Sequence, residues 1–92
     1  MIAVKVRFFA YFRELFGASE LTTELPDGAA VGDLLENLCD SPVRKREFYS
    51  ERLLRSHIVV MINGRPIDPR RGLEELLHDG DVVAVFPFLG GG

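Results

Sequence analysis

The sequence predicts an α+β fold, with one mixed β-sheet and one main helix packed across it. Three features indicate this class: an alternating strand pattern at the start, one clearly amphipathic helix, and two apolar strands in the second half. A chain of 92 residues is expected to form one domain. Its composition, 47% hydrophobic and 27% charged residues, is that of a globular protein rather than a disordered one.

The first quarter of the chain predicts two strands joined by a helical segment. Apolar side chains alternate over Ile2 to Phe9, which is typical of a strand with one buried face. Over Ala10 to Phe16 the apolar spacing changes to three and four residues, which predicts one or two helical turns, and Gly17 is placed to end them. A second strand is expected over Glu20 to Leu25, closed by a turn at Pro26 to Gly28.

The clearest helix is expected over Val31 to Leu38, where apolar residues recur at intervals of three and four. Cys39 follows this run, and without a paired histidine it is interpreted as a small core residue rather than a nucleophile. Ser41 is a suitable N-cap and Pro42 suits the first helical position, so a second, weaker helix is expected to begin there, with an irregular pattern through Leu54.

The next segment predicts a hairpin. His57 to Ile62 is an apolar strand, and Asn63-Gly64 after it is the strongest short signal for a hairpin turn. Arg65 to Ile67 is then a short return strand, which its proline confines to the edge of the sheet.

The last ordered segment predicts a helical turn, a chain turn and a strand. Leu73 to Leu77 suggests the helical turn, and Val82 to Phe86 is the final strand. Asp79 to Asp81 is interpreted as a chain turn, because it lacks the remaining oxygen ligands of a calcium loop; no metal site is expected.

The two apolar strands, Ile58 to Ile62 and Val82 to Phe86, are apolar on both faces, as in strands buried on both sides. One main helix covers only one face of a sheet. Part of the other face is therefore expected to expose apolar side chains, and such surfaces usually mark a binding partner. The alternative is that the weaker helix or the turn at Leu73 to Leu77 covers it.

Charge and cysteine content exclude several classes of protein. The net charge of −3 does not favour nucleic-acid binding, although Arg44 to Arg71 holds eight basic and three acidic residues. This basic segment could steer an acidic partner, but a solvated surface is the simpler interpretation. The single cysteine excludes an intramolecular disulfide and a zinc quartet, and no apolar run approaches the length of about 20 residues that a membrane span needs.

The start of the chain and its histidines add two expectations. Met1 to Arg7 carries charges inside its apolar stretch and is therefore not a signal peptide, so a cytoplasmic protein is expected. His57 and His78 lack a nearby nucleophile or ligand set, and no acid–base constellation is visible. A self-contained enzyme is accordingly the least favoured class.

Residues 87–92 are expected to form a flexible tail beyond a domain of residues 1–86. The tail ends in three glycines, so it is thin enough to enter a channel that excludes branched side chains. It can reach roughly 20 Å when extended. Its one reactive group is the α-carboxylate of Gly92, which becomes reactive once adenylation makes an oxygen a leaving group. It could then take up sulfide or be joined to an amine; the alternative is a frayed end without function.

Four segments, in order, carry a family resemblance. They are Val6 to Gly17, Val59 to Gly64, Leu77 to Pro87 with its Leu-x-Asp-Gly-Asp-x-Val pattern leading to Phe-Pro, and the ending Phe86 to Gly92. Together they resemble the small subunits of molybdopterin synthase, the MoaD type within the ubiquitin-like sulfur carriers. In the tail, Phe88 replaces the second proline common in that family, and Gly90 replaces the usual small residue.

The resemblance implies a β-grasp (ubiquitin-like) fold and a carrier role. In that family an E1-like enzyme of the MoeB type uses ATP to adenylate the terminal glycine, which becomes a thiocarboxylate. The tail then enters a MoaE-type large subunit and gives its sulfur to cyclic pyranopterin monophosphate. The carrier itself binds no cofactor, and it is the non-catalytic, sulfur-carrying subunit of a sulfurtransferase.

By position, the resemblance makes Gly92 the carrier residue. The residues expected to contact the partner are Phe86, Pro87, Phe88, Leu89, Gly90 and Gly91. Three alternatives stay open. The sulfur could go to thiamine thiazole, cysteine or a tungsten cofactor. The chain could be a ubiquitin-like modifier whose terminal carboxyl ends on a lysine. It could also be an interaction module with an idle tail.

Overall fold

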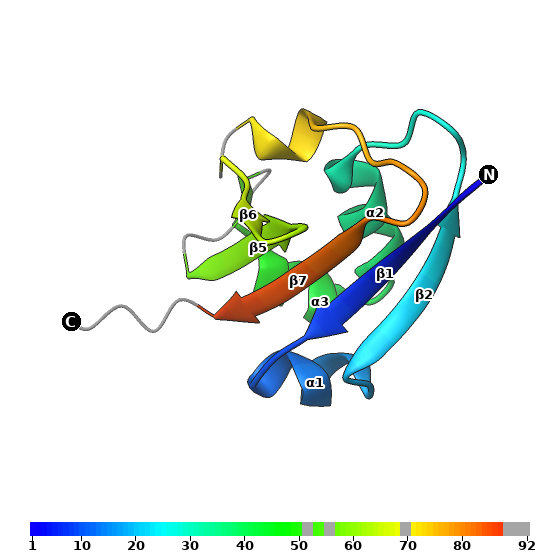
Figure 1. The fold of residues 1–92 in the computed structure, drawn as a ribbon. Helices are drawn as coiled ribbons and strands as arrows, with labels where there is room; N and C mark the ends of the chain where they lie inside the picture. Colours follow the sequence, from blue (N-terminus) through cyan, green and yellow to red (C-terminus); the bar gives the residue numbers. More distant parts are fainter. Residues whose placement is uncertain (51–52, 55–56, 69–70, 88–92) are drawn as a thin grey trace.

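The computed structural model describes residues 1–50, 53–54, 57–68 and 71–87 (Figure 1). The main sheet has five strands in the order β2-β1-β7-β5-β6. Its strands are β1 (Ile2–Phe8), β2 (Glu20–Leu25), β5 (Ile58–Ile62), β6 (Arg65–Pro66) and β7 (Val82–Pro87). The remaining elements are α1 (Tyr11–Phe16), α2 (Val31–Leu38), α3 (Pro42–Phe48), the short pair β3 (Tyr49–Ser50) and β4 (Leu53–Leu54), and the 3-10 turn η1 (Gly72–Glu74).

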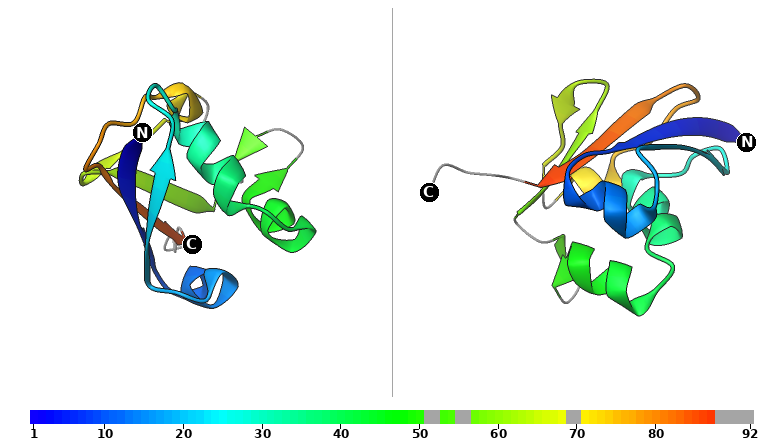
Figure 2. Two further views of the ribbon diagram at one scale, coloured as in Figure 1. Left: turned by 90° about the vertical axis from the view of Figure 1, so that its right-hand side faces the viewer. Right: turned by 90° about the horizontal axis from the view of Figure 1, so that it is seen from below.

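β1 and β7, which come first and last along the chain, lie side by side in the middle of the sheet. β1 runs parallel to β7, whereas β1 pairs with β2 and β7 pairs with β5 in antiparallel directions. The helices α1, α2 and α3 all lie on one side of this sheet (Figure 2). A mixed sheet with a helix across one face is the β-grasp arrangement, so the predicted fold class is confirmed.

The core lies between the helices and the inner face of the sheet. The central strands contribute alternate residues, such as Val6, Val83 and Val60, which are at most 2% exposed. The helices contribute Leu34 and Leu35 of α2, and phenylalanines of α1 and α3 form a cluster with Phe8 of β1. In that cluster the rings of Phe8 and Phe16 stack at 4.3 Å, and those of Phe12 and Phe48 lie 5.2 Å apart. Burying such rings dominates the stability of a small core.

Local sequence signals explain the helix ends. Gly17 ends α1 in the left-handed conformation, with φ of 70°. The side chain of Asp33 accepts a hydrogen bond of 2.8 Å from the backbone N–H of Ala30 at the start of α2. The Ser41 hydroxyl accepts one of 3.2 Å from the Arg44 N–H at the start of α3. Each signal acts within a few residues, so these elements agree with the sequence predictions.

Two predicted elements differ from the structure. The weaker helix ends at Phe48, and the chain continues into the small pair β3 and β4. The helical turn predicted over Leu73 to Leu77 is wrong in its limits, because η1 covers only Gly72–Glu74. After it, the Leu77 N–H donates to the Ala29 carbonyl at 2.8 Å and the Glu75 carbonyl accepts from Val31 at 2.9 Å. These long-range hydrogen bonds replace those of a continued helix.

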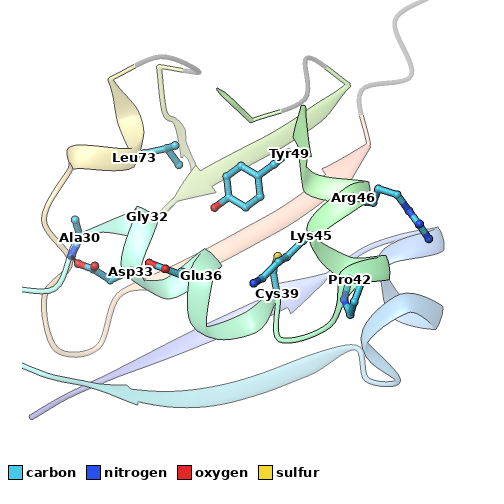
Figure 3. A pocket seen from close by; sticks show the side chains of 10 residues that line it. All are labelled: Ala30, Gly32, Asp33, Glu36, Cys39, Pro42, Lys45, Arg46, Tyr49 and Leu73. Atoms are coloured by element: carbon cyan, nitrogen blue, oxygen red, sulfur yellow. Dashed lines mark hydrogen bonds between the residues drawn. The ribbon is translucent and has the colours of Figure 1, made fainter. Parts of the chain in front are cut away.

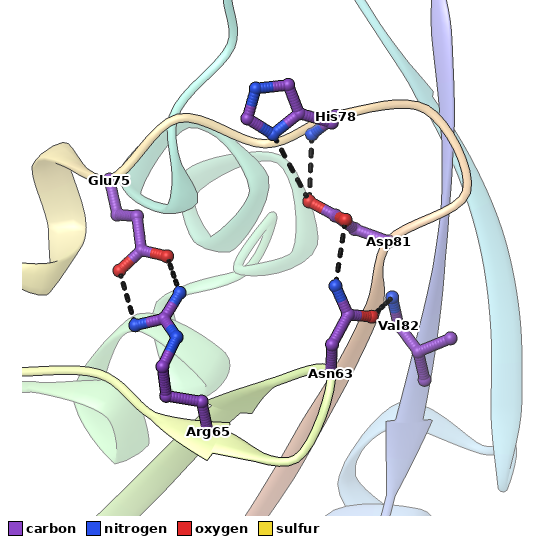
Figure 4. A network of polar contacts seen from close by, with 6 residues as sticks. All are labelled: Asn63, Arg65, Glu75, His78, Asp81 and Val82. Carbon is purple, nitrogen blue, oxygen red and sulfur yellow. Dashed lines mark hydrogen bonds and ion pairs between the residues drawn. The ribbon is translucent and has the colours of Figure 1, made fainter.

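A polar network ties the β5–β6 hairpin to the turn before β7 (Figure 4). The Asn63 side chain accepts from the Val82 N–H at 2.9 Å and donates to Asp81 at 3.0 Å, while Asp81 accepts from the His78 N–H at 2.8 Å. Arg65 pairs with Glu75 across the same loop. The network shows that Asp81 is used as a turn acceptor, as predicted for Asp79 to Asp81.

No helix within the described ranges has the length and apolar character needed for a bilayer span.

Candidate functional site

Two of the predicted site residues, Phe86 and Pro87, stand at the end of β7. Pro87 is the last residue of this strand and pairs with Ile58 of β5, so β7 is one residue longer than predicted. Phe88, Leu89, Gly90, Gly91 and Gly92 lie outside the described residues. The part of the site visible in the structure is therefore the surface from which the tail departs.

That surface lies on the face of the sheet opposite the helices. Ala84 and Phe86 point outward from β7, since Val83 and Val85 between them are fully buried. In the neighbouring strand, Met61 pairs with Ala84. The predicted exposed apolar surface is therefore present, because all three helices described lie on the other face.

Phe9 and Ala10, the two residues that follow β1, extend this surface. The ring of Phe9 meets the ring of Phe86 edge to face, with centroids 6.0 Å apart. Phe9 is 37% exposed, and the Arg7 guanidinium lies 5.7 Å from its ring centroid. Ala10 follows at the turn into α1. Residues from both ends of the chain therefore meet here, because β1 and β7 are parallel neighbours.

Together these side chains form an open groove of about 480 Å³, which we call the exit groove. Its lining is wholly apolar and consists of Phe9, Ala10, Met61, Ala84, Phe86 and Pro87. Such a groove offers no acid, base or metal ligand, but it can receive apolar side chains of another protein. Sequence reasoning had singled out only Phe86 and Pro87 among these residues. The signal for Phe9 was its large apolar ring on the polar side of an alternating strand.

The other half of the outer face is polar. Lys5 and Arg7 of β1 lie beside Glu20 of β2, at 3.7 Å and 3.8 Å from its carboxylate oxygens. These groups are about half exposed, and such pairs contribute little to stability. The exit groove is thus bordered by charge along β1 and β2.

A second depression lies on the helix side of the sheet, between α2 and α3 (Figure 3). This helix cleft has a volume of about 670 Å³, with Asp33 and Glu36 on one wall and Lys45 on the other. Cys39 lines it but is only 1% exposed, and burial raises the pKa of its thiol to about 11. The thiol is therefore protonated at neutral pH and a poor nucleophile, which agrees with the prediction of a core residue.

The predicted basic segment is partly used inside the fold. The Arg44 guanidinium lies 4.8 Å from the Phe16 ring, donates to the Leu15 carbonyl at 3.2 Å and pairs with Asp40 at 2.8 Å. Arg65 is held by Glu75, which raises the pKa of its guanidinium. These contacts favour the structural interpretation of the segment over a steering surface.

Comparisons with known proteins identify relatives over almost the whole chain. Residues 6–92 match the ThiS family. The chain is 34% identical to Small archaeal modifier protein 3 of Haloferax volcanii, over 97% of this chain and 98% of that protein. It is 35% identical to the molybdopterin synthase sulfur carrier subunit of Chlamydomonas reinhardtii, over 97% and 98%. The solution structure of small archaeal modifier protein 1 from Methanosarcina acetivorans superposes with a TM-score of 0.82 at 35% identity, covering 100% of this chain and 98% of that one.

Proposed function

Because the chain belongs to the ThiS family of ubiquitin-like sulfur carriers, we propose that it is the small, sulfur-carrying subunit of a molybdopterin synthase. It carries sulfur as a thiocarboxylate on Gly92. The observation that carries the proposal is the position of the exit groove, which ends at Pro87, five residues before the terminal glycine. A partner bound in this groove is within reach of the tail.

The chemistry follows from the carboxylate. In the activating enzyme, a Gly92 oxygen attacks the α-phosphate of ATP, and pyrophosphate leaves. A sulfide-equivalent sulfur then attacks the acyl carbon, AMP leaves with the oxygen, and a thiocarboxylate remains. In the synthase this sulfur bonds to a carbon of cyclic pyranopterin monophosphate while a carbon–oxygen bond at that carbon breaks and the oxygen leaves. Water then cleaves the acyl–sulfur bond, which restores the Gly92 carboxylate and leaves the sulfur on the pterin. This chain contributes the carried atom and its positioning, while the partners supply ATP and catalytic groups.

The exit groove supports the docking part of the proposal. Phe86 and Phe9 are rigid aromatic side chains that already contact each other, so few rotamers are lost when a partner covers them. The proposed partners are a MoaE-type large subunit and an E1-like enzyme of the MoeB type. Phe88, Leu89 and Gly90 are proposed to occupy the channel that leads to the reaction site, with Gly91 beside the reacting glycine.

The proposal is tested by reconstitution. The chain is incubated with the MoeB-type enzyme, ATP and sulfide, then purified and mixed with the MoaE-type large subunit and cyclic pyranopterin monophosphate. We expect molybdopterin to form with the full chain and not to form when Gly91 and Gly92 are deleted. Loaded carrier that yields no molybdopterin contradicts the proposed acceptor. Copurification of a thiazole or cysteine synthase in place of the large subunit would identify a different recipient.

A second candidate function is protein modification, which the similarity to Small archaeal modifier protein 3 favours. Here an amine of a target lysine attacks the adenylated Gly92, AMP leaves and an isopeptide bond forms. Trypsin is a poor choice for finding such bonds, because it cleaves after lysine and arginine, and the last of these is Arg71. A remnant of 21 residues, 72–92, would therefore remain on the target. Chymotrypsin, which cleaves after Leu89, leaves a short Gly-Gly-Gly remnant on the target lysine. Such remnants, absent when the tail is deleted, support modification.

A further inference from the structure

The backbone of Ala10 adopts a conformation that is unfavourable for alanine. Its φ is 55° and its ψ is −134°, and the Phe9 carbonyl accepts a hydrogen bond of 3.2 Å from the Phe12 N–H across it. These values describe the first central position of a type II′ turn, where glycine is strongly preferred because it has no Cβ. Ala10 is also the N-cap of α1, a position where alanine is disfavoured and glycine is accepted.

The rest of the described chain follows the ordinary rule. Positive φ angles occur at Gly17, Gly28, Gly64 and Gly80, where no Cβ is present. Asn63 also has a positive φ, of 51°, but its side chain makes two hydrogen bonds that hold it there. Within the described ranges, Ala10 is the one residue that combines a Cβ, a positive φ and a side chain that cannot form a hydrogen bond.

Folding does not account for the methyl group of Ala10. The residue is exposed and is absent from the hydrophobic core, so its methyl adds little buried area. Glycine at this position would make the same turn without strain. Ala10 does line the exit groove, together with Phe9 and Phe86. Strain that persists without a gain in packing points to a functional use of the side chain.

We propose that Ala10 is a recognition residue of the exit groove. Its methyl forms the wall that packs against an apolar side chain of the partner, and the strained turn fixes Phe9 at the edge of that wall. The inference rests on the proposed function, because it names a contact for the partner that receives the tail. It adds a specificity role for a residue at the opposite end of the chain from the reacting glycine.

The test compares two alanine-to-glycine variants in the same groove. A10G removes the methyl and the strain together, so its Tm is expected to equal or exceed that of the wild type. Its affinity for the partner is expected to fall about fourfold or more, the loss that corresponds to one buried methyl group. A84G removes a methyl from β7, where glycine weakens a strand, so both its Tm and its affinity are expected to fall. Binding is measured by titration calorimetry against the purified MoaE-type subunit, the partner proposed to receive the tail.

The opposite movement of Tm and affinity in A10G is the signature that a purely structural role would not produce. If A10G binds the MoaE-type subunit as tightly as the wild type, or if its Tm falls as far as that of A84G, the inference is overturned while the proposed function stands. If the wild-type chain does not bind this subunit, the proposed function is overturned, and the inference falls with it.

Discussion

The exit groove and the helix cleft lie on opposite faces of one sheet and differ in almost every property. The cleft is larger, about 670 Å³ against 480 Å³, and it holds charged side chains and the single cysteine. The groove is smaller and holds no group with chemistry of its own. By size and polarity alone the cleft would be chosen as the active site. The position of the exit groove favours it instead as the candidate site, because the groove ends at Pro87, where the tail begins.

Two groups of the chain could carry sulfur, the Cys39 thiol in the helix cleft and the Gly92 carboxylate at the end of the tail. Cys39 carries the only thiol, but burial keeps it protonated and shields it from reagents. Gly92 carries no sulfur, but in the proposed function a partner activates its carboxylate. A carrier must bring its reactive atom to a partner, and a side chain buried in the core cannot reach one. In the proposed function the domain therefore binds the partner, and the reaction takes place at the C-terminal glycine.

Removing the tail is expected to have the largest effect. Deletion of Gly91 and Gly92 takes away the carboxylate that we propose to react, so sulfur transfer is expected to be lost completely. The Tm is expected to stay within a degree of the wild type, because the deleted residues follow β7 in the sequence. Transfer is measured by molybdopterin formation and Tm by calorimetry. Residual transfer in the truncated chain would show that sulfur travels on another group.

The next largest effect is expected from a substitution that distinguishes the exit groove from the helix cleft as the docking site. F86D places a carboxylate in the exit groove, and burying an unpaired charge against a partner is expected to weaken binding at least about 30-fold. E36Q instead removes a carboxylate from the helix cleft, and it is expected to leave the affinity unchanged. Both affinities are measured by titration with the MoaE-type subunit. The reverse pattern would make the cleft the docking site.

The Asn63 network is expected to stabilise the fold and to take no part in binding the partner. N63A removes the hydrogen bonds to Val82 and Asp81 and places alanine at a positive φ, so the free energy of unfolding is expected to fall by about 2 kcal/mol. Affinity for the partner is expected to stay the same, since Asn63 does not line the groove. Urea denaturation gives the stability. A change in affinity without a change in stability would contradict the assignment of Asn63 to the stability of the fold rather than to binding.

The smallest expected effect concerns alkaline pH. The pKa of Cys39 is raised by burial from 9.0 to about 11, so above pH 9 the unfolded chain loses a proton that the folded chain keeps. Stability is therefore expected to decline as pH rises from 9 to 11, by roughly 1–3 kcal/mol. C39A should show a shallower decline over this range when unfolding is followed at several pH values. Equal slopes in both chains would show that Cys39 is not the responsible group.

Sequence reasoning succeeded where the determining contacts are local. The spacing of Val31 to Leu38 specified α2, and Asn63-Gly64 specified the hairpin, whose positive φ angles of 51° and 83° the structure contains. It failed at Leu73 to Leu77, where hydrogen bonds to Ala29 and Val31 decide the conformation. Those partners are more than 40 residues away, so a local pattern could not reveal them.

The same limit applies to the candidate site. The Phe-Pro and glycine pattern indicated the tail and its chemistry, and the apolar strands indicated an exposed surface. The composition of the exit groove could not be predicted, because Phe9, Met61 and Phe86 come together only through the register of three strands. The strain at Ala10 is a property of the folded backbone and leaves no mark in composition or spacing.

Intact-protein mass spectrometry of the chain, purified after reaction with its activating enzyme, ATP and a sulfur donor, tests most directly whether Gly92 is the carrier. If Gly92 is the carrier, the mass increases by the amount expected for one oxygen replaced by sulfur. Fragmentation locates this increase at Gly92, and C39A shows it as well. An unchanged terminus together with a sulfur atom added to Cys39 would contradict this assignment.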